Sequence, residues 1–278
     1  MFNALIIVWR ESLEAMLVIG VLFSWIARQP LVAEQVQLKR GLWSGAGAGI
    51  LLALAVAYAT FAIQSEFGGL ALERFQLAMV LIATGLILHM VVWMHRHGRT
   101  MKRQLESRAE SSAGAFGIAA ITTLAVAREG AETVIFLYGL GLEASGGTLA
   151  GLLAAALAGF VLAGATAWLV ARGARFLNYR RLFQISEILL LLIAHALLAN
   201  GVDRLIGLDW LPTLLDPVWD SSALLADGHG FGRFLADFVG YRARPAGSFL
   251  IASLLFWSYA FWQLGWRLPL RRVEAARA

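Results

Sequence analysis

Seven stretches of this chain are apolar and long enough to cross a lipid bilayer as helices, and this feature constrains the fold most. A hydrocarbon core of about 30 Å requires about 20 mostly apolar residues in helical form. The stretches are residues 3–26, 42–63, 71–94, 115–140, 148–171, 182–202 and 246–266. They predict an all-α integral membrane protein with seven transmembrane helices.

The composition excludes the soluble alternatives. The 278-residue chain is 59% hydrophobic and only 15% charged, whereas soluble globular proteins carry roughly 25% charged residues. The absence of cysteine from the sequence excludes disulfides, thiolate metal sites and iron–sulfur clusters. The sequence also has no nucleotide-phosphate motif.

The distribution of Lys and Arg predicts the orientation of the spans. With the N-terminus outside, sixteen of these residues fall on the inner side and five on the outer side. Cytoplasmic loops carry such an excess of positive charge. We therefore expect the C-terminus in the cytoplasm. The net charge of +5 then needs no nucleic-acid partner to explain it.

Two charged clusters interrupt the apolar stretches. Residues 10–14 read Arg-Glu-Ser-Leu-Glu and residues 128–132 read Arg-Glu-Gly-Ala-Glu, so both have the form Arg-Glu-x-x-Glu. A charged side chain at the bilayer centre costs at least about 2.5–3.5 kcal/mol. One such cluster could be a structural bridge between helices, but two copies with one spacing favour a functional site.

The spacing within each cluster indicates cation binding. Glutamates three residues apart lie on one helix face, so Glu11 and Glu14, like Glu129 and Glu132, can present two carboxylates to one ion. The four Glu and two Arg of the clusters sum to a formal −2, which a multivalent cation would stabilise. Both pairs lie roughly 12–17 Å from the outer ends of their spans at 1.5 Å per residue. We therefore expect one shared site near the middle of the membrane.

The clusters also predict an internal repeat. They are three spans apart, and an odd number of spans reverses direction, so residues 1–94 and 115–202 would form an inverted repeat. Residues 203–245 would be an outer, periplasmic loop and residues 246–266 a seventh helix, all within one permease domain of residues 1–278. Small residues every four positions in the second and fifth spans favour close helix packing, beginning with Gly41, Gly45 and Gly49 in one and Gly151, Ala155 and Gly159 in the other.

Other polar residues extend the possible ion pathway. Glu187 and His195 are two helical turns apart on one face and could relay cations or protons, although a lone histidine in a membrane helix is more often a packing residue. The outer loop holds six aspartates, among them Asp216 and Asp220. They could form a cation-collecting vestibule or a docking surface, or simply lie in a solvated connection.

The paired motifs strongly resemble those of the oxidase-dependent iron permease family, which carries Arg-Glu-Gly-x-Glu in helices 1 and 4. Residues 128–132 fit that form, and Ser12 replaces the usual glycine in the first copy. Leu215–Asp220, Ser221-Ser222, Gly240-Tyr241 and Pro245 look like the prokaryotic branch, so the resemblance covers nearly the whole chain.

The resemblance implies a multi-pass permease of the bacterial inner membrane, surrounded by lipid, rather than an enzyme. It makes iron the transported ion, taken as ferric iron from a periplasmic iron-oxidising or iron-delivering partner, with no organic cofactor. It assigns the iron ligands to Glu11, Glu14, Glu129 and Glu132, supported by Arg10 and Arg128.

Two other functions are compatible with the residues alone. Carboxylate ligands without thiolates favour hard cations in general, so a carrier for another divalent cation could use the same glutamates. A membrane oxidoreductase could bind haem between His89 and His195, which lie in different spans.

Overall fold

The computed structural model describes residues 2–98, 100–112, 114–141, 149–172 and 179–265. Within these ranges the protein is all-helical, with nine helices and no strand. The helices are α1 (Phe2–Ile26), α2 (Val32–Ser65), α3 (Gly69–His97), α4 (Met101–Glu110), α5 (Gly114–Gly141), α6 (Leu149–Ala171), α7 (Tyr179–Gly207), α8 (Gly230–Val239) and α9 (Gly247–Leu264).

Five helices among the described residues are both long and apolar enough to cross a membrane. They are α2, α3, α9 and the stretches Ala150–Ala171 of α6 and Leu182–Gly207 of α7. Helices α1 and α5 have 25 and 28 residues, which is spanning length, but each carries one Arg-Glu-x-x-Glu cluster. The all-helical membrane architecture is therefore confirmed, while the count of seven spans stays a prediction.

The helices extend beyond the predicted spans at several places. Helix α2 begins at Val32 rather than at residue 42. The predicted span contained only the apolar residues, whereas the first turns of the helix carry charges that suit a position outside the apolar layer. The loop after α3 contains the short polar helix α4. Helix α8 in the outer loop was not predicted. Thr148, Trp266 and the tail from residue 267 lie outside the described residues.

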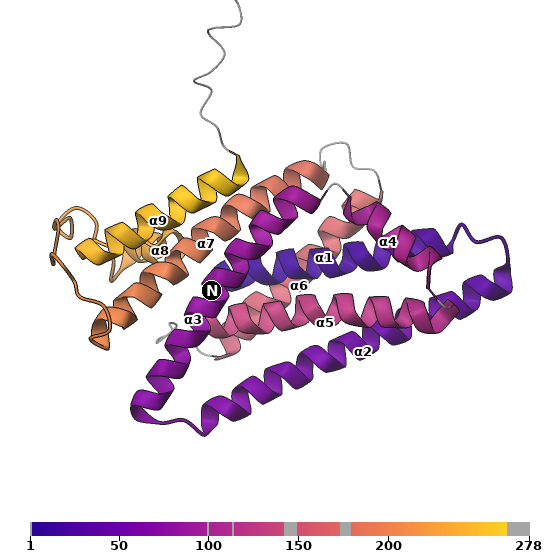
Figure 1. Ribbon diagram of the computed structural model, residues 1–278, viewed down its shortest axis with the longest axis horizontal. Helices are drawn as coiled ribbons and strands as arrows, with labels where there is room; N and C mark the ends of the chain where they lie inside the picture. The colour runs from indigo at the N-terminus through magenta and orange to yellow at the C-terminus, as the bar shows by residue number, and fades with distance from the viewer. Residues whose placement is uncertain (1, 99, 113, 142–148, 173–178, 266–278) are drawn as a thin grey trace, which may run out of the picture.

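The helices of the two predicted halves pack across each other (Figure 1). Helix α2 makes its most extensive contacts with α5, α6 with α1, and α3 with α7. Each long helix of residues 2–97 thus has its main partner in residues 114–207. This packing between the two halves places α1 and α5 side by side at the centre of the molecule. These are the two helices that carry the charged clusters.

Glycines make these cross-contacts close. A Cβ atom added to Gly41 or Gly45 of α2 would collide with the backbone of Ala115 or Ala119 in α5. At that crossing the Thr123 hydroxyl donates a hydrogen bond to the Gly45 carbonyl oxygen at 3.1 Å. In a bilayer, close packing and interhelical hydrogen bonds replace the hydrophobic drive for helix association.

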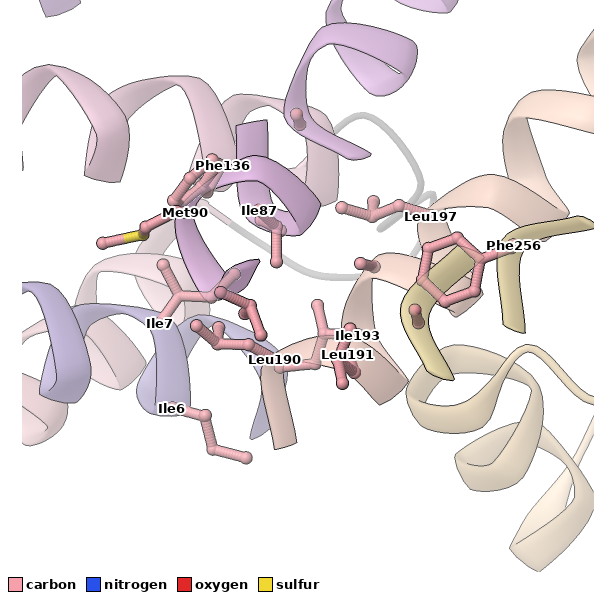
Figure 2. Packing of buried hydrophobic residues seen from close by; sticks show 14 of the residues in the cluster. Ile6, Ile7, Ile87, Met90, Phe136, Leu190, Leu191, Ile193, Leu197 and Phe256 are labelled. Atoms are coloured by element: carbon pink, nitrogen blue, oxygen red, sulfur yellow. The ribbon is translucent and has the colours of Figure 1, made fainter. Parts of the chain in front are cut away.

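The largest apolar core lies where α3 and α7 cross α1 and α5 and continues to α9 (Figure 2). Its fully buried members include Ile7 of α1, Ile87 of α3, Phe136 of α5 and Leu190 of α7. Phe256 adds the contact with α9. Ala109 and Leu105 of α4 belong to a separate apolar cluster.

Candidate metal centre

Three carboxylates from two helices meet in the interior. Glu11 and Glu14 come from α1 and Glu129 from α5. One oxygen of each lies within 4.8 Å of the others, and all three residues are buried. Spacing along α1 puts its two glutamates on one face, and the packing of α5 against α1 adds the third. Carboxylate oxygens at such separations suit a hard cation.

The two arginines of the clusters hold these carboxylates unequally. Arg10 is buried, with Nη1 3.0 Å from Glu11 Oε1 and Nη2 2.5 Å from Glu14 Oε1. Arg128 lies 2.7 Å from Glu129 Oε1 and 3.4 Å from Glu132 Oε1, but its side chain is 47% exposed. Arg10 is therefore sealed inside the site, whereas Arg128 faces outward from it.

Each of the four glutamates keeps a buried oxygen that accepts no hydrogen bond. These atoms are Glu11 Oε2, Glu14 Oε1, Glu129 Oε2 and Glu132 Oε2, of which Glu14 Oε1 makes only the ion pair with Arg10. Burying an ionised carboxylate without full compensation is costly. The remaining oxygens therefore give the site unused capacity to bind a cation.

Glu132 is less fully part of this group. It is partly buried, and the structure does not bring it within the set formed by Glu11, Glu14 and Glu129. It lies one turn along α5 from Glu129 and contacts Arg128. Of the four predicted ligands, three therefore meet directly and the fourth stands beside them.

The small residue in each cluster has a packing role. A Cβ atom on Gly130 would collide with the Cβ atom of Ala53 in α2. The corresponding Ser12 in α1 is only partly buried and lines a groove instead. The second cluster therefore requires glycine for the approach of α2, and the first tolerates a larger residue.

Two cavities reach the carboxylates. A groove of about 830 Å³ between α1, α2 and α5 is lined almost wholly by apolar residues, with Glu11 and Glu129 among the few polar ones. A second cavity of about 290 Å³, here termed the α4 cavity, extends from Glu14 and Glu129 to Arg108 of α4. Glu129 lines both cavities.

The side of the carboxylates away from α4 is closed by apolar packing. Ile7 lies one turn before Glu11 in α1, and Phe136 lies one turn after Glu132 in α5; both are completely buried. Figure 2 shows them packed among Ile87 and Leu190 of the main core. We refer to Ile7 and Phe136 as the apolar seal.

Glu187 and His195 lie in different surroundings. Glu187 pairs with His95 of α3 at 3.3 Å, near the end of α3 that leads to α4. Both ring nitrogens of His195 are engaged, with the Val239 carbonyl oxygen at 2.6 Å and Ser253 Oγ at 3.0 Å. His195 therefore joins α7 to α8 and α9, and the structure does not bring it to the glutamates.

Three of the six aspartates of the outer loop lie close to arginines. Asp220 accepts hydrogen bonds from Arg244 at 2.6 and 2.9 Å, and this guanidinium holds the pKa of Asp220 below its ordinary value. Asp203 pairs with Arg242 at 2.7 Å. Asp216 is exposed and precedes a cis peptide bond to Pro217. These pairings offset part of the negative charge of the loop.

Two residues near the site were missed from the sequence. The Trp93 ring lies 5.6 Å from the Arg128 guanidinium carbon and stacks on His97. Met90 places its sulfur against Arg10. Both are in α3, and nothing in the spacing of α3 indicates which of its many apolar residues reach the arginines.

Comparisons with known proteins relate the chain to iron permeases. The model of the iron permease FTR1 family matches residues 1–268. The chain is 26% identical over 258 residues to a protein of Yersinia pestis named ferrous iron permease EfeU, covering 89% of this chain and 87% of that protein. It is 28% identical over 263 residues to the protein of the same name from Escherichia coli O6:H1, covering 89% of each. No solved structure matches the chain.

Proposed function

The chain belongs to the iron permease FTR1 family, and we propose that it imports iron through a site formed by Glu11, Glu14 and Glu129 with Glu132 beside them. The observation that carries this proposal is the meeting of three buried carboxylates from two helices. Arg10 and Arg128 are supports that hold the carboxylates in place and reduce their mutual repulsion. Iron is the transported substrate.

The proposed topology has seven spans in the bacterial inner membrane, formed by α1, α2, α3, α5, α6, α7 and α9. The N-terminus is periplasmic and the C-terminus cytoplasmic, which puts α4 in the cytoplasm and α8 in the periplasm. The excess of Lys and Arg on the α4 side supports this orientation.

We further propose that residues 1–94 and 115–202 are inverted repeats of one permease domain, followed by the loop 203–245 and the helix 246–266. The reciprocal packing of α2 on α5 and α6 on α1 supports this relation, because a two-fold axis would exchange those two contacts. The same axis would exchange α3 with α7 and so map the contact between them onto itself. In other transporters, substrates bind at the interface of such repeats.

The cavities support a cytoplasm-facing state of this transporter. On the α4 side a cavity reaches Glu14 and Glu129, whereas on the other side the apolar seal is closed. Aligning the two clusters by their 118-residue separation matches Ile7 with Ala125 and Phe136 with Val18. Ala125 and Val18 line the α4 cavity. Each residue of the apolar seal thus corresponds, in the other half, to a residue that lines the open cavity. Alternating access requires such a difference between the two halves.

We propose that the site binds ferric iron, as the family resemblance implies. All the grouped ligands are carboxylate oxygens, which suit hard cations and are compatible with ferric iron. The related proteins of Yersinia pestis and Escherichia coli are named for ferrous iron. We propose that a periplasmic partner oxidises or delivers the iron, so that external ferrous iron and ferric iron at the site are compatible.

Uptake of radioactive iron by cells expressing the chain tests the proposal. Glu14→Gln or Glu129→Gln should reduce uptake by more than about tenfold. Mutation of residues that only support the ligands of a metal site already reduces metal affinity or activity by about that factor. Glu73→Gln removes an exposed glutamate of α3 and should leave uptake unchanged. Near-normal uptake by either site variant at normal protein abundance would contradict the proposed site. Supplying iron as ferric citrate or as ascorbate-reduced iron separates the two oxidation states.

A further inference from the structure

The α4 cavity has a distinctive wall. Helix α4 contributes Met101, Gln104, Leu105 and Arg108 to it. These residues are spaced by three, four and seven positions, so they form a single face of α4. Helix α5 contributes Arg128, which pairs with Glu129 and whose side chain is 47% exposed.

The acidic residues of α4 point elsewhere. Glu106 pairs with Arg28 at 2.5 Å, beyond the end of α1. Glu110 lines a separate cavity with Trp25 and Glu34. Within the described part of the chain, no carboxylate is paired with the Arg108 side chain. The α4 cavity is therefore lined both by carboxylates, from Glu14 and Glu129, and by guanidinium groups, from Arg108 and Arg128.

This arrangement is unfavourable for a bare cation but suitable for a cation bound to an anion. A multivalent cation leaving Glu14 and Glu129 would pass Arg128 and Arg108, which repel it. A small anion held by the two arginines would reverse that effect. The planar guanidinium fork matches the geometry of carboxylate and phosphate groups, and the Gln104 amide can donate a further hydrogen bond.

We propose that the α4 cavity binds a small oxygen-donor anion, a carboxylate or a phosphate, between Arg108 and Arg128, and that this anion takes the cation over from Glu14 and Glu129. The exchange is of ligands only: each metal–glutamate bond that breaks is replaced by a bond to an anion oxygen, and no electron is transferred. This inference rests on the proposed function, because it concerns release of the same ion.

Binding is tested without iron. Citrate or inorganic phosphate should raise the thermal unfolding temperature of the detergent-purified protein, in a saturable way. Arg108→Gln should abolish this shift. Arg103→Gln removes an equal charge from an exposed position of α4 that does not line the cavity, and it should retain the shift. Equal shifts in the wild type and Arg108→Gln would overturn the proposal.

Transport is tested in proteoliposomes loaded with citrate, with sulfonate buffer alone, or with a cationic hydroxamate chelator. Citrate inside should increase the initial rate of iron entry severalfold in the wild type and in Arg103→Gln, but not in Arg108→Gln. Because each protein is compared with and without citrate, differences in abundance cancel. The free chelator traps iron, but its hydroxamic acid groups are protonated near neutral pH and offer the arginines no anion. Equal stimulation by it would therefore mean simple trapping and would overturn the proposal.

Two further comparisons in the same assay distinguish the source of the anion and separate this inference from the proposed function. Replacing neutral lipid by phosphatidylglycerol shows whether a lipid headgroup supplies the anion, in which case stimulation would need no citrate and would still require Arg108. Iron entry that is normal but independent of any anion would reject this inference and leave the permease function standing. Absence of iron entry in the wild type would instead reject the proposed function.

Discussion

At the residue scale, the centre is organised by the unequal settings of two arginines. Arg10 is sealed and contacts two carboxylates of its own helix, whereas Arg128 is half-exposed and bordered by Trp93. A buried guanidinium stays favourable only while its partners satisfy it. Arg10 therefore acts as a fixed element of the site, and Arg128 lies where the site meets the α4 cavity.

Replacing each arginine by lysine should distinguish these settings. Lysine keeps the charge but loses the planar fork that contacts two carboxylates at once. We expect Arg10→Lys to lower apparent iron affinity by about 10–100-fold, as supporting residues of metal sites do, and to lower the thermal unfolding temperature. Arg128→Lys should reduce uptake while leaving that temperature nearly unchanged. Equal thermal effects of the two substitutions would contradict the distinction.

At the element scale, the position of α2 depends on small residues. Its glycines contact α5, while most of its remaining surface is exposed apolar side chains that suit lipid. Helix α2 also meets α5 beside the site, where Ala53 approaches Gly130. The packing of α2 on α5 therefore affects how α5 presents Glu129.

Two glycines of α2 provide a matched test. Gly45→Ala would place a methyl group 2.9 Å from the Ala119 Cα atom, whereas Gly47→Ala meets no atom within 4 Å. Overpacking of this kind costs about 1–3 kcal/mol. We expect Gly45→Ala to lower the thermal stability of the purified protein and Gly47→Ala to leave it unchanged. Similar behaviour of the two variants would mean that close packing at Gly45 is unimportant.

At the scale of the whole molecule, the proposed orientation and the proposed state make separate predictions. The orientation puts α4 and the loop of residues 203–245 on opposite sides of the membrane. The state opens the site toward α4 and closes it at the apolar seal. Since the sequence contains no cysteine, single introduced cysteines report accessibility without background.

Orientation is tested at exposed positions. Leu224→Cys, in the outer loop, should react with a membrane-impermeant reagent in intact spheroplasts, because Leu224 is 91% exposed. Ser107→Cys, on the exposed side of α4, should react only after the membrane is permeabilised. Labelling in the opposite pattern would reverse the proposed topology.

The state is tested at matched positions of the two halves. Ala125→Cys lines the α4 cavity and should be labelled in inside-out vesicles. Ile7→Cys is completely buried in the seal and should be protected from reagent on either side. Protection of Ala125→Cys together with labelling of Ile7→Cys from the periplasm would indicate an outward-facing state instead.

The sequence by itself determined that this is a helical membrane protein, and it showed which charged residues interrupt the apolar spans. Hydrocarbon requires long apolar runs whose backbone groups are bonded internally, and it makes intramembrane charge so costly that the charges of residues 10–14 and 128–132 are conspicuous. Both constraints act locally along the chain. Both constraints can therefore be recognised in a sequence stretch of about 20 residues. The family assignment agrees with the resulting prediction of a membrane permease.

Only the tertiary structure decided which of these residues meet. Glu129 lies 118 residues from Glu11, and its approach depends on the rotation of α5 against α1. The same packing leaves Glu132 beside the group and engages both nitrogens of His195 with α8 and α9. The rotation of a helix and its contacts with distant segments depend on how whole helix surfaces fit together. No single spacing in the sequence predicts that fit.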